Sequence, residues 1–173
     1  GYLYPGVANS KFMSARQAVG LIQDGSVIAT SGLAANQRAS IIYWALRELY
    51  QESGHPANLT VICTGGQGGR GKAPGTLEEL GVEGLCTRFI AGHLETFKSI
   101  LKLAEAGRIE LHCLPQGIIT LLFEAQAEGR NSLVSELGID TFVDPRCGRG
   151  TPVNRSEAEQ LVTVEGDRLR FHL

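Results

Sequence analysis

Glycine follows four of the strands that the sequence predicts, and this spacing is its strongest chemical signal. Apolar or β-branched runs end at Ser31-Gly32-Leu33, at the glycine-rich segment 65–71, at Gly92-His93 and at Pro115-Gln116-Gly117; a fifth loop covers 144–150. Open parallel sheets bind ligands at the carboxyl ends of their strands. Glycine there lets a ligand approach the backbone and leaves N–H groups free to face it. We therefore expect loops 31–33, 65–71, 92–93 and 115–117 to line one small-molecule cleft.

Nine residues of these loops are candidates for contact with the ligand. They are Ser31, Gly32, Leu33, Gly66, Gly68, Gly92, His93, Gln116 and Gly117. His93 is the one histidine that follows a strand, and it could form a polar pair with Glu95, although histidines in apolar surroundings more often have a structural role. Cys147 is either a reactive thiol beside two arginines or an ordinary loop residue.

Two nucleotide-binding motifs are absent on mechanistic grounds. The segment 66–72 satisfies G-x-x-x-x-G-K, but Ala73 stands where a P-loop needs a serine or threonine to hold Mg²⁺. Pro74-Gly75 also prevents a helix from beginning at Lys72. The first strand-to-helix turn, 31–37, has a single glycine, whereas a dinucleotide fingerprint needs three.

Composition excludes several other classes of function. The formal net charge is −2 and 43% of the residues are hydrophobic, so the chain has neither the basic stripe of a nucleic-acid-binding protein nor the composition of a disordered one. No apolar run approaches the roughly 20 residues that span a bilayer, and no basic amphipathic helix suggests membrane-surface binding. The cysteines Cys63, Cys86, Cys113 and Cys147 lack metal-binding or redox spacing. We expect free thiols in the cytoplasm, no metal and no cofactor.

The elements that position the loops are predicted by apolar spacing and turn residues. Strands are expected at 27–30, 59–63, 88–91, 109–114 and 141–143. Helices are expected from the capping box Ser14-Gln17 to Asp24, from about 36 to 53, over 94–104 and over 118–127, with a short helix at a second capping box, 76–79. This alternation predicts an α/β fold with an open, mainly parallel sheet and helices on both faces.

The last segment has a different pattern. The runs 161–164 and 169–173 flank Glu165-Gly166-Asp167, which is typical of a β-hairpin. We expect one domain over 1–173. Because the sequence stops within an apolar strand pattern, we also expect the native polypeptide to continue beyond Leu173.

The order of these pieces resembles class I CoA-transferases, and the acetate and propionate branch in particular. The similar features are Lys11-Phe12 followed by 14–25 and 27–33, the glycine run near Gly65, the Gly92-His93 turn, 114–117 and 141–146. They cover the chain from about Lys11 to Leu173. The fold implied is the three-layer, Rossmann-like fold of that family. Two departures stand out: Ser31-Gly32-Leu33 replaces a Gly-Gly-Phe-like turn, and the family's Glu-Asn-Gly sequence, which carries the nucleophile, does not occur.

The resemblance implies a role for this chain in transfer of coenzyme A from an acyl-CoA to a carboxylic acid. In that family a glutamate attacks the acyl-CoA to give an acyl anhydride and free CoA thiolate, which then attacks the glutamyl carbonyl to give a glutamyl-CoA thioester and release the acyl group as its carboxylate. A second carboxylic acid then accepts the CoA. This chain would form the acyl-side wall, with backbone N–H groups near Gly32 facing an oxyanion and the Gln116 amide binding a substrate carboxylate. A tight turn at a helix start explains Gln116 equally simply. The catalytic glutamate would lie in a second half, and the partners would be that half, the two substrates and further copies in a homo-oligomer.

Two other classes of function fit the same fold. A sugar-phosphate-binding or regulatory module would need a phosphate site, which Arg146 or Arg149 could supply. A structural half-domain that only dimerises would gain no stability from any ligand.

Overall fold

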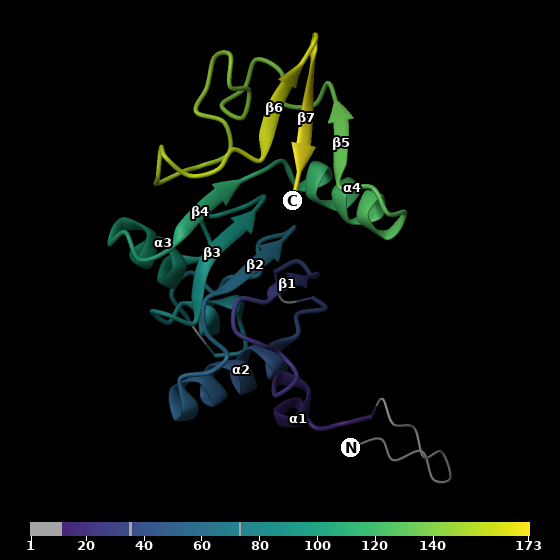
Figure 1. Cartoon of the computed structure of the whole chain (residues 1–173). Helices are drawn as coiled ribbons and strands as arrows, with labels where there is room; N and C mark the ends of the chain where they lie inside the picture. The colour runs from purple at the N-terminus through teal and green to yellow at the C-terminus, as the bar shows by residue number, and fades with distance from the viewer. Residues whose placement is uncertain (1–11, 35, 73) are drawn as a thin grey trace.

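The computed structural model describes residues 12–34, 36–72 and 74–173 (Figure 1). In chain order the elements are α1 (Ala15–Val19), β1 (Val27–Thr30), α2 (Ser40–Ser53), β2 (Leu59–Cys63), the 3₁₀ helix η1 (Leu77–Leu80), β3 (Cys86–Ala91), α3 (Lys98–Glu105), β4 (Glu110–Cys113), α4 (Gln116–Ala127), β5 (Ser132–Ser135), β6 (Val162–Glu165) and β7 (Arg168–His172).

The four strands β1 to β4 form a parallel sheet in which strand order equals chain order. Val61 lies beside Ile28 on one side and Phe89 on the other, and Phe89 lies beside Leu111. The expected α/β class and the parallel sheet are confirmed. Because all four strands point the same way, the loops that follow them lie at one edge of the sheet.

Two apolar cores lie on opposite faces of this sheet, because successive residues of a strand point to alternate faces. Val61 and Phe89 face a core that α1, α2, η1 and α3 complete. Ile62 and Ile90 face a second core that contains the buried side of α4 together with Leu169 and Phe171 of β7. Helices therefore cover both faces, but the second face has a single helix and an antiparallel sheet.

The antiparallel sheet has the order β5-β7-β6, and Figure 1 shows it beside α4 at one end of the molecule. The predicted hairpin is confirmed as β6 and β7, joined at Gly166, whose φ of 62° lies in the left-handed region that glycine favours. Its third strand, β5, was not expected from the sequence. Leu133 and Val134 of β5 pair with Phe171 and Arg170 of β7.

The expected strand at 141–143 is wrong, because the Asp144 side chain organises a turn there. Its carboxylate accepts hydrogen bonds from the N–H groups of Asp140 and Arg146, and the Asp144 N–H donates to the Thr141 carbonyl over 3.1 Å. Val143 is fully buried in the second core. The apolar residues at 141–143 therefore anchor a turn to the core and do not form a strand.

Two helices begin later than the pattern predicts. The helix α2 begins at Ser40 rather than near 36, and α3 begins at Lys98 rather than at Leu94. The first capping box is confirmed at Ser14 and Gln17. The second produces only the short 3₁₀ helix η1, in which the Thr76 hydroxyl accepts from the Glu78 N–H.

Candidate functional site

The four glycine loops lie against one another along the carboxyl edge of the sheet, in the order of their strands. A Cβ placed on Gly65 would lie 2.9 Å from the Gly32 carbonyl oxygen, and one on Gly66 would lie 2.7 Å from the His93 ring. A Cβ on Gly92 would lie 2.9 Å from the Gln116 Cα. The loops after β1, β2, β3 and β4 are therefore neighbours at a single edge.

Two separate hollows lie along this edge in the part of the chain that the structure describes, and neither is lined by all four loops that were expected to share one cleft. The first, which we call the arginine hollow, has a volume of about 360 Å³ and is lined by Ala34, Arg38, Gly66, Gly68, Gly69, Arg70 and Thr96. The second, which we call the apolar hollow, has a volume of about 570 Å³ and is lined by Gly92, Cys113, Leu114, Pro115, Gly117, Leu137, Gly138, Thr141 and Phe142. Gly66 and Gly68 thus line a different hollow from Gly92 and Gly117. The other five candidates, Ser31, Gly32, Leu33, His93 and Gln116, line neither hollow.

Most of the glycines are explained by packing between the loops. Besides Gly65, Gly66 and Gly92, a Cβ on Gly68 would collide with the Thr96 carbonyl. Gly32 has a φ of 120°, which a residue with a side chain rarely adopts. Gly117 is the exception, because nothing lies within 4 Å of a Cβ placed there. Packing or backbone conformation therefore accounts for the other glycines of this set. At Gly117 neither does, so room for a ligand is an explanation that still applies there.

Some backbone N–H groups in the loops after β1 and β4 have no hydrogen-bond partner among the described residues. The N–H groups of Leu33 and Ala34 donate to the carbonyls of Asn36 and Gly66, whereas that of Gly32 donates to no residue that the structure describes. At the other end Gln116 and Gly117 are the first two residues of α4, and Pro115 provides no side-chain cap. The first N–H groups of a helix lack partners within the helix.

The Gln116 side chain lies over Gly92, since a Cβ at Gly92 would meet its Cγ. Gln116 is exposed, and its amide makes no hydrogen bond with any described residue. The backbone carbonyl of Gln116 accepts a hydrogen bond from the Thr120 hydroxyl over 3.1 Å. Gln116 therefore begins a helix, as one sequence interpretation has it, whereas binding of a substrate carboxylate by its amide stays a prediction.

A buried polar cluster fixes the glycine run, and sequence reasoning missed it. The Gln67 side chain is fully buried, and its Oε1 accepts from the Tyr43 hydroxyl over 2.6 Å, while the Tyr43 hydroxyl also contacts the Thr30 hydroxyl. The Gln67 amide donates to the Cys63 sulfur over 3.2 Å. Burial raises the pKa of Cys63 to about 12 and also raises that of Tyr43, so both stay protonated donors at neutral pH. The signal in the sequence was a glutamine inside a glycine run.

A second buried group, Glu78, joins the glycine run to α3. Its carboxylate accepts from the N–H groups of Gly71 over 2.6 Å, Ser99 over 2.6 Å and Lys98 over 3.2 Å. It thus caps the start of α3 from a distant part of the chain and anchors the end of loop 65–71. Burial raises the pKa of Glu78, but the backbone hydrogen bonds outweigh it and lower the pKa overall.

The charged candidates form only loose contacts. Glu95 lies 3.8 Å from the His93 Nε2 and 3.7 Å from the Arg70 Nε, and all three side chains are exposed. Arg146 forms a bidentate pair with the buried Asp144, which leaves it less available to a phosphate. Cys147 is exposed, and its sulfur lies within 4.8 Å of carboxylate oxygens of Asp140 and Asp144. Because Arg146 already binds Asp144, we assign this group to the structure of the turn.

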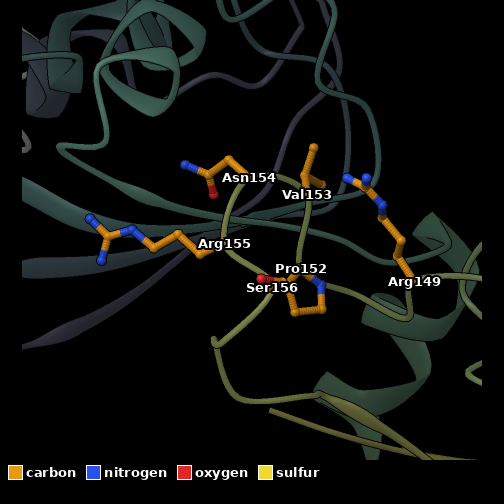
Figure 2. Close-up of a pocket in the computed structure, with 6 residues that line it drawn as sticks. All are labelled: Arg149, Pro152, Val153, Asn154, Arg155 and Ser156. Atoms are coloured by element: carbon orange, nitrogen blue, oxygen red, sulfur yellow. The ribbon is translucent and has the colours of Figure 1, made fainter.

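A polar hollow of about 410 Å³ lies over the segment that covers β4 (Figure 2). Its lining residues are Arg149, Pro152, Val153, Asn154, Arg155 and Ser156. Figure 2 shows Arg149 and Arg155 extending in different directions. Asn154 bonds to Leu111, Ala104 and Ile109, and Arg155 donates to the Gly107 carbonyl. Two of these polar side chains therefore hold the segment in place.

The chain has an α/β fold with a parallel four-stranded sheet, and its candidate site lies at the carboxyl ends of the parallel strands. No family model matches the chain. Among curated proteins it is similar to the caffeate CoA-transferase of Acetobacterium woodii, with 33% identity over 170 residues, which are 94% of this chain and 31% of that protein. It is also 32% identical to the acetate CoA-transferase YdiF of Escherichia coli K12 over 161 residues, or 92% of this chain and 30% of that protein.

Solved structures give the same result. The crystal structure of the acyl-CoA transferase YdiF apoenzyme from Escherichia coli O157:H7 matches with a TM-score of 0.82 and 29% identity, over 92% of this chain and 31% of that one. A thioester complex of the same enzyme with CoA also matches with a TM-score of 0.82, over 33% of that chain. These matches confirm the resemblance to CoA-transferases. The chain spans about a third of the length of the relatives it matches.

Among the residues that the structure describes, no helix is both long and apolar enough to cross a membrane.

Proposed function

We propose that this chain is the acyl-binding part of a CoA-transferase, which moves coenzyme A from an acyl-CoA to a carboxylic acid. The observation that carries the proposal is the apolar hollow at the start of α4, in a chain similar over more than nine-tenths of its length to CoA-transferases. Half-exposed Leu137 and Phe142 and the backbone of Gly117 line this hollow, so it suits a short acyl chain.

Gln116 and the first N–H groups of α4 provide the polar end of this acyl site. The free amide of Gln116 can donate a hydrogen bond to a carboxylate or thioester oxygen, and a helix N-terminus favours negative charge. An acyl group in the apolar hollow would place its oxygen next to these donors. The carboxylic acid acceptor would bind in the same place after the first half-reaction.

The Gly32 N–H, at the other end of the edge, is a candidate donor to another part of the bound CoA ester, because the oxyanion forms on the acyl oxygen that this proposal places beside Gln116. Adjacent strands lie about 4.8 Å apart, so three strand spacings put the loops after β1 and β4 roughly 14 Å apart. One carboxylate cannot contact both Gly32 and Gln116. Within this proposal they therefore serve different parts of the bound CoA ester, which is long enough to reach both.

The nucleophile of this proposed enzyme is a glutamate outside these 173 residues, because the Glu-Asn-Gly sequence does not occur among them. The proposed partners are the part of the enzyme that carries this glutamate and further copies of the protein. Four free thiols suit a reducing compartment, and we propose the cytoplasm.

The substitution Gly117→Ala tests the acyl site, because the protein itself has room for the added methyl group. We expect it to stabilise α4 by a few tenths to about 1 kcal/mol, since alanine is the better helix former. The methyl group would enter the acyl site, so the affinity for propionyl-CoA, measured by NMR titration, should fall at least fivefold. Gln126→Ala, an exposed position in the last turn of α4, is the control and should leave affinity unchanged. Equal affinities for both variants would contradict the acyl site.

A further inference from the structure

The arginine hollow takes no part in the proposed acyl site. Its two arginines, Arg38 and Arg70, have few acidic partners among the described residues. Arg38 is partly buried and stands two residues before α2. Its Nε is buried without a hydrogen-bond partner, and its guanidinium forms no ion pair with any residue that the structure describes. A buried guanidinium N–H without a partner is costly unless an anion or another acceptor accompanies it.

Further hydrogen-bond donors line the same hollow, on Thr96, Gly68, Gly69 and Arg70. The Thr96 hydroxyl is buried without a partner, and it lies beside Gly66, where a Cβ would be 3.3 Å from it. The N–H groups of Gly68 and Gly69 donate no hydrogen bond to a described residue. The largely exposed Arg70 side chain also lines the hollow, and its one ion pair with a described residue is the 3.7 Å contact with Glu95. All these groups are donors, and two of them carry positive charge.

We infer that the arginine hollow binds one compact oxyanion, a carboxylate or a phosphate. Arg38 would hold the anion through its planar fork, as guanidinium groups hold carboxylates and phosphates. The Thr96 hydroxyl and the N–H groups of the glycine run would complete its hydrogen bonds, as backbone N–H groups do in other anion-binding loops. The buried side chains of Gln67 and Glu78 hold the glycine run 65–71 in place through their hydrogen bonds. The inference depends on these charges and donors alone and stands apart from the proposed CoA transfer.

Replacing Glu95 should change the affinity for anions in a predictable direction. Its carboxylate contacts Arg70 and would compete with a bound anion for that charge. Glu95→Gln removes the competitor and the repulsion while keeping the size of the side chain. We therefore expect Glu95→Gln to bind anions more tightly than the unchanged protein, whereas a hollow that is merely a gap between loops would not respond.

NMR titration with sodium acetate and, separately, inorganic phosphate tests the inference. We expect shifts of the Arg38 Nε–H signal and of backbone signals at 66–70 and 96. Arg38→Ala should weaken binding at least tenfold and Thr96→Val several-fold, and the anion with the larger response identifies the source. Arg149→Ala is the control, since Arg149 lines the hollow of Figure 2 and forms no ion pair within the described residues.

Arg38→Gln, which keeps most of the side-chain volume, provides the same comparison if Arg38→Ala unfolds. The inference is overturned if both anions bind Arg38→Gln and the unchanged protein equally, or if shifts cluster at 149–156 instead. No saturable shift at 50 mM of either anion would overturn it as well.

Discussion

Gln116 combines a free amide with an exposed position, so its contribution to binding is separable from its contribution to stability. Gln116→Ala should leave the free energy of unfolding within about 0.5 kcal/mol, because the side chain makes no hydrogen bond within the described residues. If the amide binds substrate oxygen, affinity for an acyl-CoA should fall about five- to tenfold, which corresponds to about 1 kcal/mol.

Gln116→Glu sharpens this comparison. A carboxylate at this position cannot donate and would repel a substrate carboxylate, so the loss for free propionate should exceed that of Gln116→Ala. Isothermal titration of both variants measures this, with chemical denaturation as the stability readout. Early melting with unchanged affinity would assign Gln116 to helix initiation alone.

At the scale of elements, Glu78 connects two of them through a single carboxylate. Its lowered folded pKa means that its contribution to stability is complete above its unfolded pKa, near 4.3, and is lost as the pH falls through the lower folded value. Glu78→Gln should therefore cost about 1–3 kcal/mol at pH 7. It should also reduce the change in stability between pH 5 and pH 3.

Urea denaturation at several pH values measures both effects. The control is Glu105→Gln, which changes an exposed glutamate in the last turn of α3. A Glu78→Gln variant whose stability fell with acid as steeply as that of the unchanged protein would show that the bonds to Gly71 and Ser99 contribute little.

Asn154 makes a comparable connection at the edge of the sheet. Its Oδ1 accepts from the Leu111 N–H over 3.0 Å, and its Nδ2 donates to the carbonyls of Ala104 and Ile109. Asn154→Ala leaves these groups unpaired, so we expect a loss of about 1–3 kcal/mol. It also loosens the segment that covers β4, and an uncovered edge strand pairs with other chains.

Light scattering at increasing concentration checks this expectation of association. Asn131→Ala, at an exposed position before β5, is the matched control. If Asn154→Ala stayed monodisperse and as stable as Asn131→Ala, the segment would not depend on this side chain.

The elements that could be predicted from the sequence are those whose signal is local. Buried parallel strands read as continuous apolar runs, so β1 to β4 were found within two residues at each end. The turn at Asp144 and the strand β5 were missed, because a side-chain bond decides the first and pairing with β7 decides the second. The edge that gathers the glycine loops follows from topology. The roles of Gln67 and Glu78 could not be predicted in this way, because their partners are distant in sequence. Gln67 bonds to Tyr43, 24 residues away, and Glu78 bonds to Ser99, 21 residues away.

At the scale of the whole molecule, the proposed chemistry requires a group that these residues lack. Without the nucleophilic glutamate, we expect residues 1–173 alone to show background rates of exchange between acetyl-CoA and propionate, because loss of a nucleophile costs roughly 10⁴ to 10⁶ in rate. Acyl-CoA should still shift the NMR signals of the apolar hollow.

A radiolabel exchange assay measures this rate. Adding the remainder of the enzyme, either fused or as a separate chain, should restore exchange, and replacing its glutamate should abolish exchange again. Robust exchange by residues 1–173 alone would contradict the proposed division of roles and would direct attention to a carboxylate of this chain, with Glu95 first.

The order of the strands also determines how the protein can be made. Since β1, β2, β3 and β4 are neighbours in space in the order in which they are synthesised, each new strand finds its partner already outside the ribosome. The sheet can therefore grow vectorially, without waiting for a distant segment. At each stage the strand made last is the exposed edge of the growing sheet. Once β4 has been made, it stays exposed until Asn154, some forty residues later, can bond to Leu111. We therefore expect nascent chains that end between these two points to pair most readily with other chains.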